Sequence, residues 1–156
     1  WVAIVFTALL GLARAWVPEV EHGVLDGLLL APCDRSAIWL GKTVATLAFL
    51  LAAQAIALPA FVLFFAPLDG TALAGVLLAD VGICAVGSLL SAMAAAGRAR
   101  ELLLPLLVLP VALPLVVGGV GAAIAEDGVR FLAFLALYDA VFAVLSWASF
   151  EYVVTE

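Results

Sequence analysis

The chain has 156 residues, of which 68% are hydrophobic and 12% charged, and its formal net charge is −6. Its mean hydropathy is +1.34, and long apolar runs follow one another with short gaps. A helix of about 20 apolar residues crosses the roughly 30 Å hydrocarbon core of a membrane. The composition therefore excludes a water-soluble domain and indicates one all-α, polytopic transmembrane helical bundle. Since the acids are scattered and no basic stripe exists, nucleic-acid binding is excluded too.

The first apolar stretch, residues 1–15, is too short to cross a bilayer. It opens with Trp1 rather than Met, and it lacks the charged flank and small-residue cleavage site of a signal peptide. We interpret it as a partial transmembrane helix whose beginning lies outside this sequence.

The next segment, residues 16–38, overlaps the most polar stretch of the chain, EVEHGVLDGLLLAPCDRSAIWLGK (residues 19–42). At about 100° per residue, Trp16 to Leu30 predict an amphipathic helix lying in the plane of the membrane, with Pro18 tolerated in its first turn. The apolar face would carry Val17, Val20, Val24, Leu25, Leu28 and Leu29, and the polar face Glu19, His22, Gly23 and Asp26. Asp34 or Ser36 could then cap the following helix.

The acidity of this polar face indicates what it contacts. Helices that lie on lipid headgroups usually carry Lys and Arg on the polar face, whereas this face is acidic. A docking surface for a basic protein partner is therefore favoured over a passive membrane helix. For His22, a solvated residue of the polar face is favoured over a haem ligand.

Four complete spans follow, at residues 43–65, 72–96, 102–125 and 129–153. The connections are short, which predicts antiparallel neighbours in an up-down bundle. Every Lys and Arg except Arg130 lies in the gap before the first of these spans or in the loop GRARE. By the distribution of positive charge, segment 16–38 and the C-terminus should be cytoplasmic. Trp16, Trp39 and Trp147 should mark the membrane surface on that side.

Polar and helix-breaking residues inside the spans are candidates for function. Asp80 and Asp139 are costly in hydrocarbon; each either functions there, or is neutral or paired with a hydroxyl, an amide or another subunit. Pro110 and Pro114, with Pro105, predict either a static kink or a helix break that lines the centre of the subunit. Small residues spaced four apart, Gly87, Ser91 and Ala95 in one row and Ser88, Ala92 and Ala96 in the next, predict close helix packing.

Enzyme and cofactor motifs are missing from the sequence. SAIWLGKT lacks the first glycine of a phosphate-binding loop. Neither a zinc-protease motif nor a serine–histidine–aspartate set can be assembled. Cys33 and Cys84 fit neither a disulfide framework nor a metal site. The sequence therefore predicts a chain without a catalytic site, a bound metal or a cofactor of its own.

Two stretches resemble a known family. The pattern Glu19, Gly23, Leu25, Asp26, Leu28, Leu29 and Pro32, followed by Gly41 and Lys42, resembles permeases of the ABC-2 exporter type. EVEHGVLDGLLLAP and GRARELLLPLLVLPVALPLVV resemble segments of the haem exporter protein B (CcmB) family of cytochrome c maturation. The resemblance covers essentially the whole chain, and because that family has six spans, the first and part of the second would precede this sequence.

The resemblance implies a permease subunit in the bacterial inner membrane, working with a separate ATP-binding subunit of the ABC type and with haem-handling subunits. Two permease copies per complex are expected, with ATP on the partner and haem handled by the complex. The coupling residues would be Glu19, Glu21, Gly23, Leu25, Asp26, Leu28, Leu29 and Pro32. Two alternatives stay open: a scaffold that transmits ATPase motion to haem release without transport, and a secondary transporter that uses Asp80 and Asp139.

Overall fold

The structure, a computed structural model, describes residues 1–22, 24, 27, 34–65, 67–96 and 100–153. The helices with assigned bounds are α1 (Val2–Glu21), α3 (Arg35–Phe64), α4 (Gly70–Ala96), α5 (Arg100–Ile124) and α6 (Gly128–Val153). Across the described part of the chain, no strand is present. Of these helices, α3 to α6 are each long and apolar enough to cross a membrane, whereas the apolar part of α1, Val2–Trp16, is shorter. The predicted all-α membrane bundle is confirmed.

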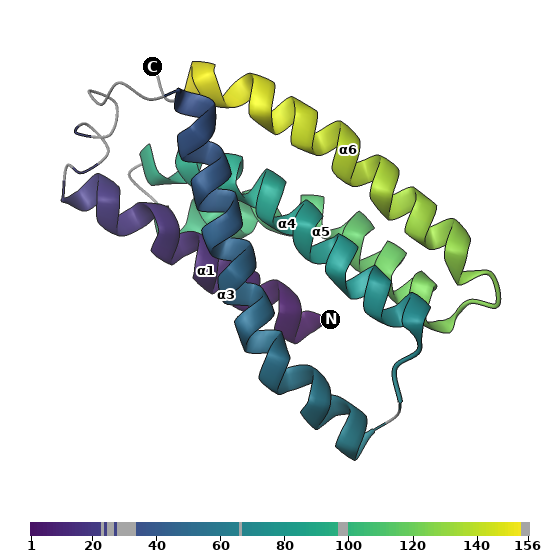
Figure 1. Cartoon of the computed structure of the whole chain (residues 1–156). Coiled ribbons are helices and arrows are strands. Elements are labelled where there is room, and N and C mark those ends of the chain that lie inside the picture. Colours follow the sequence, from purple (N-terminus) through teal and green to yellow (C-terminus); the bar gives the residue numbers. More distant parts are fainter. Residues whose placement is uncertain (23, 25–26, 28–33, 66, 97–99, 154–156) are drawn as a thin grey trace.

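The central helix of the bundle is α4. It contacts each of the other four helices and is the most buried of the four long ones. Figure 1 shows α4, α5 and α6 running beside one another, while α1 and α3 cross at one side. The beginning of α3 lies beside the end of α6 (Figure 1), so these two segments, far apart in sequence, meet at one end of the bundle.

Glycines allow the neighbouring helices to approach α4 closely. A Cβ at Gly75 would lie 2.9 Å from the Cβ of Ala122 on α5. A Cβ at Gly82 would overlap the Asp139 carboxylate on α6, and one at Gly87 would overlap Leu12 on α1. Since lipid tails are as apolar as the side chains, close packing of this kind is what holds membrane helices together.

The small-residue rows predicted from the sequence contribute to this packing. Gly87 and Ser91, four residues apart, both face Leu12 of α1. The Ser91 hydroxyl donates a hydrogen bond of 2.9 Å to the Leu12 carbonyl. This row therefore provides both the close approach and a polar contact between α4 and α1.

The longest helix, α3, is the least buried of the four spanning helices, and its outer half extends away from the bundle in Figure 1. That half exposes large apolar side chains, including Ile56, Leu63 and Phe64, which suit a lipid environment. The next helix, α4, starts at a capping residue: Asp69 accepts hydrogen bonds from the Ala72 amide (2.8 Å) and the Thr71 hydroxyl (3.0 Å).

The polar segment differs from the sequence expectation at both of its ends. Instead of ending near residue 15, α1 continues to Glu21, which places Pro18 in its last turns rather than in the first turn of a new helix. Pro18 has no N–H to donate to the Arg14 carbonyl four residues earlier, so α1 lacks one backbone hydrogen bond there. Rather than starting at residue 43, α3 starts at Arg35; Asp34 holds the N-cap position without a side-chain bond.

The proline-rich helix α5 is continuous. It contains Pro105, Pro110 and Pro114, so the helix break considered for Pro110 and Pro114 is not present. Each proline removes one backbone donor, and neighbouring helices can supply donors in its place. The carbonyls that lose their donor are those of Glu101, Leu106 and Pro110, four residues before each proline. The Tyr138 hydroxyl of α6 donates a hydrogen bond of 2.9 Å to the carbonyl of Val111, next to Pro110.

Replacing Gly82 by alanine should destabilise the protein by about 1–3 kcal/mol, because the new methyl group overlaps Asp139 and Leu115. Gly41→Ala is the matched control, since nothing lies within 4 Å of a Cβ there. We expect the control to be neutral or stabilising by up to about 1 kcal/mol through helix propensity. Unfolding in mixed detergent micelles measures both, and equal effects of the two variants would contradict the packing argument.

Candidate functional site

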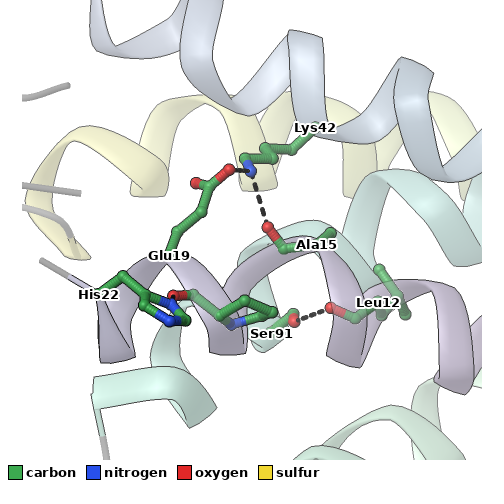
Figure 2. Close-up of polar contacts among 7 residues, drawn as sticks. Leu12, Ala15, Glu19, His22, Lys42 and Ser91 are labelled. Carbon is green, nitrogen blue, oxygen red and sulfur yellow. Dashed lines mark hydrogen bonds and ion pairs between the residues drawn. The ribbon is translucent and has the colours of Figure 1, made fainter. Parts of the chain in front are cut away.

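The strongest polar cluster of the described chain joins α1 to the beginning of α3. The Lys42 ammonium donates a hydrogen bond of 2.7 Å to the Ala15 carbonyl and forms a salt bridge with the Glu19 carboxylate, as Figure 2 shows. It also lies 5.5 Å from the centroid of the Trp16 ring, within cation–π distance. We call Ala15, Trp16, Glu19 and Lys42 the α1–α3 junction. Its position is notable because α1 and α3 flank residues 22–34, so one side chain ties both ends of that segment.

Partial burial strengthens the junction. The side chains of Lys42 and Glu19 are 16% and 28% exposed, so water screens their attraction less than in a surface pair. The second carboxylate oxygen of Glu19 is buried and has no hydrogen-bond partner among the described residues. Glu19 therefore points into the protein and is engaged there, instead of presenting a free carboxylate on an outer face.

Aromatic residues connect the junction to the rest of the bundle. Trp16 is fully buried and packs on Phe150 of α6 with 5.7 Å between ring centroids. Trp39 of α3 donates its indole N–H to the Ala85 carbonyl of α4 at 3.3 Å. Helix packing covers both tryptophans, whereas Trp147 is 56% exposed; that the three mark the membrane surface stays a prediction. A displacement of the junction would therefore also displace α4 and α6.

His22 follows the last turn of α1 and makes a local contact. Its Nδ1 lies 2.6 Å from the Pro18 carbonyl oxygen, which also accepts a hydrogen bond from the His22 amide. The side chain is exposed, and Figure 2 shows it beside the end of α1, away from Lys42. The contact satisfies a carbonyl at the helix C-terminus, as befits a residue of a solvated face.

The other predicted coupling residues cannot be placed beside Glu19. Gly23, Asp26 and Pro32 lie outside the described residues, as do Leu25, Leu28 and Leu29, and the side chain of Glu21 is likewise outside them. Of that set, Glu19 is the residue whose side chain the structure describes. Its neighbours Ala15, Trp16 and Lys42 were not predicted to form a site with it. The sequence feature that could have identified Lys42 as part of this site is a single cation at the start of an apolar span, after an acidic segment.

The first intramembrane acid, Asp80, has an amide partner. Its Oδ1 accepts a hydrogen bond of 2.9 Å from the side-chain amide of Gln54 on α3, and both side chains are buried. Pairing with an amide was one of the alternatives that the sequence left open. This contact links α3 to α4 in the apolar interior.

The second acid, Asp139, packs against Gly82 of α4. Both of its carboxylate oxygens are buried without a hydrogen-bond partner in the described part of the chain. Asp80 and Gly82 are two residues apart on α4 and hence about 200° apart around its axis. The helix α4 therefore lies between Asp80 and Asp139, and the structure does not bring them into one site.

Metal chemistry finds no support in the described residues, which include no group of three His, Cys, Asp or Glu side chains that could hold an ion. Cys84 is a buried free thiol, and Cys33 lies outside the described chain. The expectation of no bound cofactor stays a prediction.

Lys42→Met should destabilise the junction, because it leaves Glu19 without its cation. We expect a loss of about 1–3 kcal/mol in the free energy of unfolding, between the values for exposed and buried pairs.

Glu19→Gln combined with Lys42→Met should show a coupling energy above about 0.5 kcal/mol. The control is Arg130→Met, which breaks an exposed pair with Asp127 (2.5 Å; side chains 86% and 53% exposed) and should change stability by less than about 0.5 kcal/mol. Additive effects at Lys42 and Glu19 in this double-mutant cycle would refute the pairing.

Gln54→Leu should cost about 1–3 kcal/mol, because the buried Asp80 carboxyl loses its donor. The double variant Gln54→Leu with Asp80→Leu should recover part of that loss, since no polar group is then left unpaired. The same unfolding measurement tests this. If the double variant is as unstable as the sum of the two single ones, the hydrogen bond does not stabilise the bundle.

The comparison with protein families bears on the whole chain. Residues 1–151 match the family model described as CcmB protein, so the match includes the α1–α3 junction and the four spanning helices. A search of curated proteins gives no match. The resemblance predicted from the polar segment and the proline-rich span is confirmed. The chain belongs to the CcmB family and is a multi-pass membrane protein with a role in haem export for cytochrome c maturation.

Proposed function

We propose that this chain is the membrane permease subunit of an ABC-type complex and is driven by a separate ATP-binding subunit. The observation that carries the proposal is that Lys42 ties α1 to α3 on either side of residues 22–34. A partner that pushes or pulls this segment would move both helices together. Given the family's role in haem export, this motion would drive haem export by the complex.

Docking is assigned to the segment between the two helices. Besides Glu19, which is paired with Lys42, segment 16–38 contains the acids Glu21, Asp26 and Asp34, and we assign the contact with a basic partner to Glu21 and Asp26. Charged contacts of this kind set partner choice and association rate. Segment 16–38 and the C-terminus would face the cytoplasm of a bacterial inner membrane, where ATP is available, and this orientation follows from the positive-charge distribution.

Transmission is assigned to the α1–α3 junction. Trp16 rests on Phe150 of α6, and Trp39 is bonded to the Ala85 carbonyl of α4. Packed interiors transmit displacement because they have few voids to absorb it. The path from the docked partner would therefore run through Lys42 into α4 and α6.

We further propose that the chain itself binds neither ATP nor haem. Haem iron requires an axial ligand such as His, Cys, Met or Tyr, and the single histidine, His22, is engaged with the Pro18 carbonyl at the end of α1. Haem would be the cargo of the complex and would be held by its haem-handling subunits. Two copies of this chain would complete the permease, and the exposed apolar face of α3 offers a surface for the second.

Asp139 is the observation that favours a different function. A buried carboxyl with no partner among the described residues is a candidate proton carrier in a membrane, as a secondary transporter would need. The separation of Asp139 from Asp80 by α4 weakens this candidate, because the two acids cannot share a proton or an ion directly. A scaffold that transmits ATPase motion without transport would use the same junction as the permease.

Three variants of the complete protein, co-expressed with the ATP-binding subunit, separate docking from transmission. Glu21→Lys with Asp26→Lys should reduce co-purified ATPase at least about tenfold, an effect equivalent to about 1.4 kcal/mol. Lys42→Met should leave co-purification intact yet lower the yield of c-type cytochromes. Arg130→Met, at the opposite end, should change neither readout.

Each readout can contradict its own part of the proposal. Unchanged co-purification after the double reversal would refute docking on this segment. Normal cytochrome assembly with Lys42→Met, at normal protein level in the membrane, would refute transmission through the junction. Assembly that needs no ATPase but is lost in Asp139→Asn would favour the secondary transporter.

A further inference from the structure

A groove runs between α5 and α6 at the end of the bundle opposite the α1–α3 junction. Its volume is about 550 Å³, within the range of sites that hold small molecules. Val117 and Gly118 of α5 form one wall, and Phe131 and Phe134 of α6 form the other. In Figure 1 the two helices meet there at their connecting loop, the far end from the beginning of α3.

The groove has one charged end and one apolar end. Asp127 and Arg130 line it where α6 begins, and Phe134 lies seven residues further along the chain. Seven helical residues span about 10 Å, and one leaflet of the hydrocarbon core is about 15 Å deep, half of the roughly 30 Å total. The groove thus descends from the membrane surface into a single leaflet, as an acyl chain does.

The charges at its mouth carry both signs. The guanidinium of Arg130 is paired with Asp127 at 2.5 Å, yet its side chain is 86% exposed. Glu126, the residue before Asp127, is also exposed. Glu126 does not line the groove but adjoins Asp127 in the chain, so one cation and two carboxylates lie near this mouth. Their net charge of about −1 disfavours a purely anionic headgroup and favours one that brings its own cation.

We propose that this groove binds a zwitterionic phospholipid with a primary ammonium headgroup, of the phosphatidylethanolamine class. Its phosphate contacts Arg130, its ammonium contacts the carboxylates of Glu126 and Asp127, and one acyl chain lies between Val117 and the two phenylalanines. Guanidinium–phosphate pairs form strong hydrogen bonds. The ammonium has three N–H donors for the carboxylates, whereas a choline headgroup has none.

The test is native mass spectrometry of the complete protein, purified in detergent with equal amounts of phosphatidylethanolamine, phosphatidylcholine and phosphatidylglycerol that carry the same acyl chains. We expect phosphatidylethanolamine to be retained about fivefold over each of the others, the factor that corresponds to one charged contact of about 1 kcal/mol. Equal retention of the three lipids, or a preference for phosphatidylglycerol, would overturn the proposal.

Two changes locate the binding. Asp127→Asn should abolish the preference, because it removes a carboxylate that binds the ammonium while all three lipids keep their phosphate, and Val117→Trp should abolish retention by filling the groove. The matched control is Leu113→Trp: Leu113 is exposed on the same face of α5, one turn away, and lies outside the groove lining. All variants must elute as the native protein does in size-exclusion chromatography. If phosphatidylethanolamine is retained equally by all of them, it binds elsewhere and the assignment is wrong.

A competition experiment distinguishes the lipid from its headgroup. Glycerophosphoethanolamine carries the same phosphate and ammonium without acyl chains, and we expect it not to displace the lipid at equal concentration. Displacement would show that the groove contributes nothing to binding and would overturn the acyl part of the proposal.

Discussion

Close packing against α4 is the constraint on which the rest of this structure depends. In hydrocarbon, association gains nothing from burying apolar surface, so it relies on contact between closely approaching backbones. Gly75 and Gly82, seven residues apart, provide that approach on one side of α4, toward α5 and α6, and Gly87 provides it on another side, toward α1. The positions of α1, α5 and α6 depend on this central surface, and so does the α1 side of the α1–α3 junction.

Polar groups add direction to the packing. Ser91 bonds to the Leu12 carbonyl of α1, Trp39 to the Ala85 carbonyl, and Gln54 to Asp80. Each bond joins α4 to α1 or α3, and each satisfies a group that hydrocarbon cannot solvate. These contacts fix the rotation of the helices about their axes, which close packing alone leaves less defined. They also explain how a force applied at Lys42 can reach the centre of the bundle.

The two ends of the molecule use charge in opposite ways. At the α1–α3 junction, the pair of Lys42 and Glu19 is mostly covered and serves internal cohesion. At the α5–α6 end, Arg130 and Asp127 are largely exposed and are available to a ligand. Burial decides the difference, because solvent screens an exposed pair and leaves its groups free to exchange partners.

The sequence by itself determined the helical membrane architecture, the number of long spans and the family, since span length, mean hydropathy and local motifs are properties of contiguous residues. It also identified Asp80 and Asp139 as unusual. Only the tertiary structure decided that α4 separates these two acids, and that Glu19 is bound by Lys42 rather than free. The reason is physical: pairing across helices depends on rotation and register, which are set by contacts between residues far apart in the chain and are not encoded in any one segment.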